Sequence, residues 1–227
     1  MNTKLIRPVT AEFVATALFV YVGAGSVVMN AVSANTLGPL AVAFAHGIAL
    51  AILVSMTMGI SGGHVNPAVT VSLLAAGKVD RRTAGAYIVA QLAGAALGAL
   101  LVKLTFPLQA GIVTNLGTPA MSAHVGSFLQ GTAIEAVFTF LLVSAVFGTA
   151  VSADAPKIGG FGIGLAVFVG AVVAGPLTGA ALNPARAFGP ALVAGEWHSQ
   201  AAYWIGPLVG GLAAAVLWSR VLLPKTT

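Results

Sequence analysis

The distribution of apolar residues constrains this chain more than any other feature. Six apolar runs are long enough for a helix to cross a bilayer, which takes roughly 20 residues. They fall at about 8–31, 38–59, 84–106, 127–151, 158–177 and 201–222. Two further runs, at about 66–77 and 183–194, hold about 12 residues each, too few to cross and typical of re-entrant half-helices. The pattern predicts an all-α membrane protein with six transmembrane helices and two half-helices.

Composition supports a membrane protein and argues against other classes. Of 227 residues, 58% are hydrophobic and 7% charged, and the mean hydropathy is +1.00, which does not fit a soluble domain. The net charge of +5 would indicate a nucleic-acid partner only if the basic residues formed a patch. They flank the spans instead, on the side that the positive-inside rule makes cytoplasmic, and both termini are expected there. These residues are Lys4, Arg7, Lys78, Arg81, Arg82, Lys157, Arg220 and Lys225.

The sequence offers little for covalent or metal chemistry. With no cysteine there is no disulfide, thiol nucleophile or thiolate metal site. No acid–base pair or cluster of metal-ligating residues stands out, so we expect neither an enzyme nor a cofactor or metal. The start, MNTKLIRPVTAEF, leads into an apolar run without a small-residue cleavage site, which favours a first span over a signal peptide.

The two halves of the chain repeat each other. AEFVATALFVYV matches IEAVFTFLLVSAV, and AYIVAQLAGAALGAL matches AYWIGPLVGGLAAAV. The repeat aligns Glu12 with Glu135, Asn66 with Asn183, Tyr87 with Tyr203 and Gly94 with Gly210. Because each half has an odd number of spans, the second half must enter the membrane inverted. We expect one domain over 1–227, with repeat one at about 1–106, a connecting loop at about 107–126 and repeat two at about 127–227.

Each short run opens on the same three residues. The motifs are Asn66, Pro67 and Ala68, and Asn183, Pro184 and Ala185. Asn is a preferred N-cap, and Pro at the next position suits the first turn of a helix. Inversion makes the two half-helices enter from opposite faces, so that their positive N-terminal ends meet at the midplane. The two Asn amides would there offer N–H donors to a solute.

The stretches before the motifs are expected to be non-helical. They contain Gly62, Gly63, His64 and Val65 in repeat one, and Gly179, Ala181 and Leu182 in repeat two. Irregular backbone is tolerated at membrane depth where its carbonyls line a watery path. Such a path with positive helix ends at its centre would conduct neutral polar solutes and repel cations, including protons.

Only the second motif carries a charge. Arg186 follows Asn183 by three residues, whereas Val69 takes that place in repeat one. A cation in the first turn is destabilised by the helix dipole, and something must offset that cost. Arg186 either pairs with a carboxylate, or snorkels, or has a function in the path. In the path, its fork of N–H donors would bind a solute oxygen and add positive charge against cations.

With SGGHVNPAVT, LNPARAFGP and the glutamates near the start of spans one and four, the chain resembles the aquaporin or major intrinsic protein family over nearly its whole length. The resemblance implies one pore per subunit, a homotetramer in the lipid bilayer, and passive conduction of water or small neutral solutes. The family's four filter positions correspond to His46, Ala171, Ala180 and Arg186. A shift of one residue would replace Ala171 by Gly170 or Val172.

The filter resembles that of the plant tonoplast intrinsic group, which has His at the first position and a small residue at the third. It departs from the water-selective pattern, with an aromatic first and His second, and from the glycerol-facilitator pattern, with two aromatics. Two alanines imply a filter at least as wide as the group's. The resemblance therefore implies water and, as further candidates, ammonia, urea, hydrogen peroxide and glycerol.

Several other polar residues are expected to support the structure. Glu12 and Glu135 should be buried carboxylates that accept hydrogen bonds from the re-entrant loops, with a proton relay as the alternative. His46 either faces the pore or is a satisfied buried histidine. His64 is expected to brace the first loop, and His124 either caps the outer mouth or is solvated.

One rival function uses the same architecture. A secondary transporter also places half-helix ends at the midplane, but it needs a coupling-ion site, for which the sequence offers only Glu12 and Glu135. We therefore expect a channel. The short termini favour a cell (inner) membrane of a prokaryote as its location.

Overall fold

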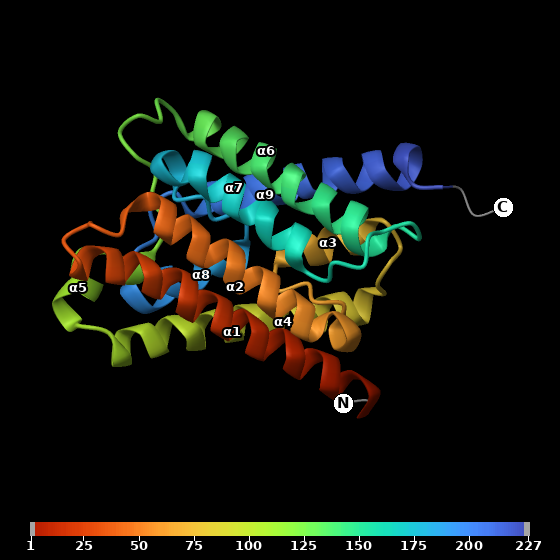
Figure 1. Cartoon of the computed structure of the whole chain (residues 1–227), viewed down its shortest axis with the longest axis horizontal. Coiled ribbons are helices and arrows are strands. Elements are labelled where there is room, and N and C mark those ends of the chain that lie inside the picture. Colours follow the sequence, from red (N-terminus) through yellow and green to blue (C-terminus); the bar gives the residue numbers. More distant parts are fainter. Residues whose placement is uncertain (1–2, 225–227) are drawn as a thin grey trace.

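The computed structural model describes residues 3–224, and every regular element in that range is helical (Figure 1). Six helices are long and apolar enough to cross a membrane. They are α1 (Thr3–Val32), α2 (Gly38–Ser61), α4 (Arg81–Thr105), α6 (Phe128–Val146), α7 (Phe161–Thr178) and α9 (Gln200–Leu217). Two π-helical segments, η2 (Phe147–Val151) and η3 (Trp218–Leu222), continue α6 and α9. The six predicted spans are confirmed.

The two half-helices are α3 (Pro67–Ala75) and α8 (Pro184–Ala194). At 1.5 Å per residue each covers about 15 Å, roughly half of a bilayer's hydrocarbon core. Each begins at the predicted proline, directly after an Asn N-cap with extended backbone. The span before each loop ends on a left-handed glycine, Gly62 with φ 90° and Gly179 with φ 78°. The reversal into each loop therefore needs a residue without a Cβ.

The remaining regular elements lie in the connecting loop, as α5 (Leu108–Val113) and the 3₁₀ helix η1 (Asn115–Gly117). The start of α1 and the end of η3 lie at one end of the bundle, which we call the inner end, and α5 lies at the opposite, outer end (Figure 1). Lys225 of the predicted basic set lies outside the described residues, and so does the side chain of Lys4.

Helix packing follows the sequence repeat. α1 packs on α2 and α4, α6 packs on α7 and α9, and α2 packs on α7 to join the halves. The close approaches are equivalent: a Cβ added to Gly94 would collide with the carbonyl of Phe13 on α1, and one on Gly210 with the carbonyl of Ala136 on α6. Small residues let membrane helices approach this closely. The structure therefore has the predicted inverted arrangement of three plus three spans.

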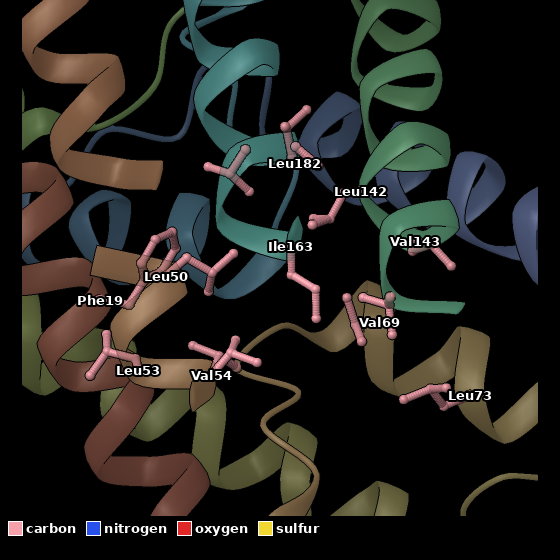
Figure 2. Close-up of a cluster of buried hydrophobic side chains, with 14 of the residues drawn as sticks. Phe19, Leu50, Leu53, Val54, Val69, Leu73, Leu142, Val143, Ile163 and Leu182 are labelled. Atoms are coloured by element: carbon pink, nitrogen blue, oxygen red, sulfur yellow. The ribbon is translucent and has the colours of Figure 1, made fainter. Parts of the chain in front are cut away.

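An apolar cluster joins the two halves near the centre of the bundle. Figure 2 shows Phe19 and Leu50 from repeat one near Leu142, Ile163 and Leu182 from repeat two. The outward faces are also apolar, with large exposed side chains such as Leu104 and Leu129. A surface of this kind suits lipid rather than water.

The glycine contacts give a direct test. Gly210→Ala should lower the stability of the detergent-solubilised protein by about 1–3 kcal/mol, because the added methyl forces α9 away from α6. Gly85→Ala is the matched control, since a Cβ there meets nothing within 4 Å. Thermal unfolding measures both variants. Equal melting temperatures for the two would contradict the packing described.

Candidate functional site

The two half-helix N-termini meet and are joined by hydrogen bonds between the repeats. The side-chain Oδ1 of Asn66 accepts from the N–H of Ala68 at 2.8 Å, while its Nδ2 donates to the carbonyl of Leu182 at 2.8 Å. The amide of Asn183 does the same, with Ala185 N–H at 3.0 Å and the carbonyl of Val65 at 2.9 Å. Since an amide nitrogen carries two hydrogens, each asparagine keeps one N–H for a further acceptor.

Glu12 holds the first loop. Its Oε1 accepts from the N–H of His64 at 2.9 Å and its Oε2 from the N–H of Val65 at 2.7 Å. The hydroxyl of Ser61 and the amide of Gln91 also donate to this carboxylate, at 2.6 and 2.8 Å. All four contacts are donors to a fully buried carboxylate.

Glu135 holds the second loop in the same way. Its two oxygens accept from the N–H groups of Ala181 at 3.0 Å and Leu182 at 2.8 Å, and the hydroxyl of Thr178 donates at 2.7 Å. In each half a tyrosine hydroxyl adds a bond to the end of the preceding span, Tyr203 to the carbonyl of Thr178 at 2.8 Å. The carboxylates thus fix both loops against their neighbouring helices.

The loops adopt backbone conformations that need this support. Val65, Ala180 and Leu182 have φ values of 53°, 43° and 50°, a region that non-glycine residues rarely occupy. Such strained residues persist only where the surroundings determine them, and here buried hydrogen bonds do so. The turns aim the carbonyls of Val65 and Leu182 at the asparagine of the opposite repeat.

A cavity of about 240 Å³ opens toward the outer end and brings the four predicted filter residues together. They are His46, Ala171, Ala180 and Arg186. The neighbouring alternatives for the second position point elsewhere. A Cβ on Gly170 would meet Leu182 at 2.9 Å, and Val172 is 39% exposed and does not line the cavity. The geometry therefore favours Ala171 over either neighbour.

The guanidinium group of Arg186 is hydrogen-bonded on both sides. Its Nη1 donates to the carbonyl of Gly117 at 2.9 Å, and its Nε and Nη2 lie 3.3 and 3.2 Å from Nε2 of His46. No carboxylate within the described residues lies within ion-pair distance of this group. Only 2% of Arg186 is exposed, so the side chain neither snorkels nor forms an ion pair. Its charge remains directed at the cavity.

His46 is fixed in one tautomer. Its Nδ1 lies 2.9 Å from the carbonyl of Val42, which can only accept, so Nδ1 carries the hydrogen. Nε2 is then a bare lone pair that accepts from the guanidinium of Arg186. Phe19 packs edge-on against the ring, with 6.1 Å between ring centroids. His46 is thus both a satisfied histidine and a cavity wall.

Between the two loops the space narrows to a constriction of about 10 Å³. A single water needs about that much room. Its lining contains the polar residues Asn66, Asn183 and His64, and most of the other lining residues are apolar, with Phe19 and Leu50 among them. The second loop connects the two spaces, because Ala180 lines the cavity and the next three residues line the constriction.

Sequence reasoning missed the part played by the connecting loop. Gly117 offers the carbonyl that holds Arg186, and Thr118 and Pro119 line the outer cavity. His124, a candidate for the outer mouth, is exposed and does not line the cavity. One signal was available, since the tight stretch NLGTP is the most turn-prone part of this loop.

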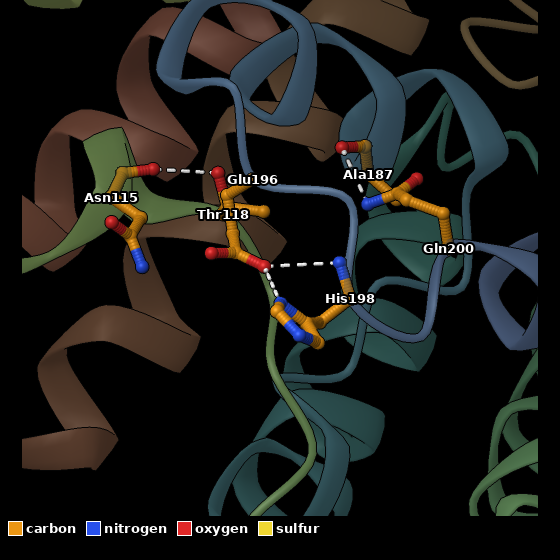
Figure 3. Close-up of polar contacts among 6 residues, drawn as sticks. All are labelled: Asn115, Thr118, Ala187, Glu196, His198 and Gln200. Carbon is orange, nitrogen blue, oxygen red and sulfur yellow. Dashed lines mark hydrogen bonds and ion pairs between the residues drawn. The ribbon is translucent and has the colours of Figure 1, made fainter.

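A polar cluster at the outer end surrounds the loop before α9 (Figure 3). Glu196 accepts from the backbone N–H of His198 at 3.0 Å and also contacts the Nδ1 of its ring. These hydrogen bonds, the backbone one first, lower the pKa of Glu196 below its ordinary value. His198 is exposed, Glu196 is partly exposed, and neither lines the cavity, so the pair belongs to the outer surface.

Six spans, two half-helices that meet inside the bundle and a narrow path lined by both polar and apolar residues define a channel-type membrane protein. A model of the major intrinsic protein family matches residues 1–218, and the chain belongs to that family.

Named relatives agree with this assignment. The chain is 39% identical to aquaporin TIP4-4 of Zea mays over 228 residues, 97% of this chain and 88% of that protein. It is 39% identical to aquaporin TIP2-1 of Arabidopsis thaliana over 229 residues, again 88% of that protein. The aquaglyceroporin structure from Plasmodium falciparum superposes with a TM-score of 0.80 at 22% identity, covering 96% of both chains. That likeness concerns the fold.

The carboxylates give the second test. Glu12→Gln and Glu135→Gln should each lower stability by about 1–3 kcal/mol, because an amide nitrogen would replace one acceptor and leave a buried loop N–H unpaired. Glu196→Gln, at the partly exposed outer surface, is the chemical control and should change stability less. Thermal unfolding and water permeability are measured together. Unchanged melting temperatures in both buried variants would contradict the assigned role.

Proposed function

We propose that the chain forms a passive pore for water and small neutral solutes. The observation that carries this proposal is the pair of asparagine amides at the constriction, each bonded to the opposite loop and each with one N–H left over. Two donors side by side would hold the oxygen of a passing molecule in a fixed orientation. The relatives named aquaporin support the same activity.

Ions would be rejected by electrostatics and by dehydration. The N-terminal ends of α3 and α8 place partial positive charge at the constriction, and Arg186 adds a full charge further out. Most of the residues that line the constriction are apolar, so an ion that entered would lose its water and gain few ligands in exchange. A neutral solute meets neither cost.

His46, Ala171, Ala180 and Arg186 would form the selectivity filter around the outer cavity. Arg186 retains N–H groups beyond those bound to Gly117 and His46, and these would bind a solute oxygen. The two alanines keep the cavity wide, which supports ammonia, urea, hydrogen peroxide and glycerol as candidates besides water. Binding the solute by hydrogen bonds involves no covalent step, so the proposed activity is conduction rather than catalysis.

Residues 1–227 would act as one channel domain, as the contact between α2 and α7 and the reciprocal asparagine bonds support. The inner end would face the cytoplasm of a cell membrane, because Arg7, Lys78 and Lys157 all belong to segments at that end. Membership of the family supports a homotetramer with a pore in each subunit.

The described residues offer little for a coupled transporter. Glu12 and Glu135 are the acidic residues of the spans, and their oxygens are already bonded to loop and side-chain donors. A coupling cation would have to break those bonds and unfold the loops. Conduction should therefore follow the solute gradient alone.

Light scattering from proteoliposomes tests the function. Rapid shrinkage in sucrose should be accelerated by the protein, and the rate should be unchanged when sodium or proton gradients are imposed. Reswelling in glycerol or urea at equal osmolarity then ranks the solutes. Flux that required an ion gradient would indicate a transporter, and absence of accelerated shrinkage would contradict the proposal.

Arg186 provides a separate prediction about selectivity. Arg186→Val should preserve water permeability but raise proton leakage, because the buried charge facing the cavity is lost. A pH-sensitive dye inside valinomycin-treated vesicles measures the leak. Lys103→Gln, which removes an exposed cation from the outer part of α4, should leave it unchanged. Equal leakage in the two variants would exclude Arg186 from proton rejection.

A further inference from the structure

Among the described residues, one edge of the His64 ring is hydrogen-bonded and the other is not. His64 is one of the residues that line the constriction, and its ring packs edge-on against Tyr87. Its Nδ1 lies 3.1 Å from the hydroxyl of Thr70. Its Nε2 has no hydrogen-bond partner within the described part of the chain, and this edge lies beside the exposed Gly62. The tautomer of His64 therefore decides whether the path meets a donor or an acceptor here.

The hydroxyl of Thr70 settles that tautomer by its bonding capacity, which is one hydrogen and two lone pairs. Its hydrogen has an acceptor in the carbonyl of Asn66 at 3.0 Å, and the Nε2 of Gln91 donates to it at 3.0 Å. One lone pair is left for His64. With hydrogen on Nδ1 of His64, the hydroxyl makes three hydrogen bonds: it donates to Asn66 and accepts from Gln91 and His64. With hydrogen on Nε2 instead, Nδ1 can only accept, so the hydroxyl can donate either to Asn66 or to His64 and makes two hydrogen bonds.

Gln91 is oriented in turn by Glu12. The side-chain nitrogen of Gln91 lies 2.8 Å from Oε2 of Glu12, and a carboxylate that accepts three other donors requires the NH₂ end on this side. The same NH₂ group reaches Thr70. The NH₂ group of Gln91 thus donates both to Glu12, the carboxylate that also holds the loop, and to the hydroxyl of Thr70.

We propose that Thr70 and Gln91 are positioning residues that hold His64 with hydrogen on Nδ1, so that its Nε2 is a hydrogen-bond acceptor in the pore. This inference rests on the proposed pore function. His46, at the outer cavity, has the same tautomer, but Arg186 occupies its lone pair.

The consequence is a reversal of hydrogen-bonding polarity along the path. Arg186 and the two asparagines offer donors, and His64 then offers an acceptor. A solute that crosses must be able both to accept and to donate, as water, ammonia, urea and alcohols do.

Solid-state NMR of the full-length protein in proteoliposomes, labelled with ¹⁵N at histidine, tests the tautomer directly. The His64→Gln variant assigns the signal by its disappearance. The expected result at neutral pH is a protonated Nδ1 and a bare Nε2. A protonated Nε2, with or without Nδ1, would overturn the proposal.

Thr70→Val removes the hydroxyl at nearly constant shape. The ratio of the two tautomers should fall about five-fold, the effect of one ordinary hydrogen bond, and water permeability should fall with it. Thr70→Ser should restore both. Thr139→Val is the matched control, because that buried hydroxyl has no partner among the described residues. An unchanged tautomer ratio in Thr70→Val would overturn the positioning role.

The outcomes for the pore and for the tautomer can be separated. Wild-type protein that accelerates water flux but carries hydrogen on Nε2 of His64 would refute this inference and leave the proposed function intact. Wild-type protein without flux would refute the proposed function, whatever the tautomer.

Discussion

The structure depends on how backbone N–H and C=O groups are satisfied at membrane depth. A half-helix that starts inside the bilayer leaves its first N–H groups and the preceding loop without helical partners. Here the Asn caps take the helix N–H groups, and Glu12 and Glu135 take the loop N–H groups. The N–H groups that these bonds leave unpaired, one on each asparagine, are the groups available to a solute in the path.

The two repeats share this supporting framework but differ in the residues that line the path. The glutamate, the tyrosine and the capping asparagine occur in both halves with equivalent bonds. The loop residues that line the constriction include His64 in one half and its equivalent Ala181 in the other. Thr70, which holds His64, corresponds to Ala187, and Val69 corresponds to Arg186. Symmetry therefore governs folding, while the functional chemistry is divided between an inner and an outer half.

Much of this could be predicted from the sequence, for physical reasons. Span lengths are set by bilayer thickness, and Asn-Pro at the start of a short apolar run specifies a cap, so the eight membrane elements were predictable to within a few residues. The roles of Gly117 and Gln91 were not. Gly117 acts through a hydrogen bond to Arg186, 69 residues away, and Gln91 acts through bonds to Glu12 and Thr70, 79 and 21 residues away. No local pattern carries that information.

We propose that the two spaces along the path divide the work of selection. Alanine stands at two of the four predicted filter positions around the outer cavity of about 240 Å³, so this cavity would discriminate by charge and hydrogen bonding more than by size. The constriction of about 10 Å³ lies between loops held by buried carboxylates and cannot widen without breaking those bonds. Size selection would therefore be strongest at the asparagine pair. Replacing the alanines would change which solutes gather at the outer end, whereas the loop anchors would set which of them cross.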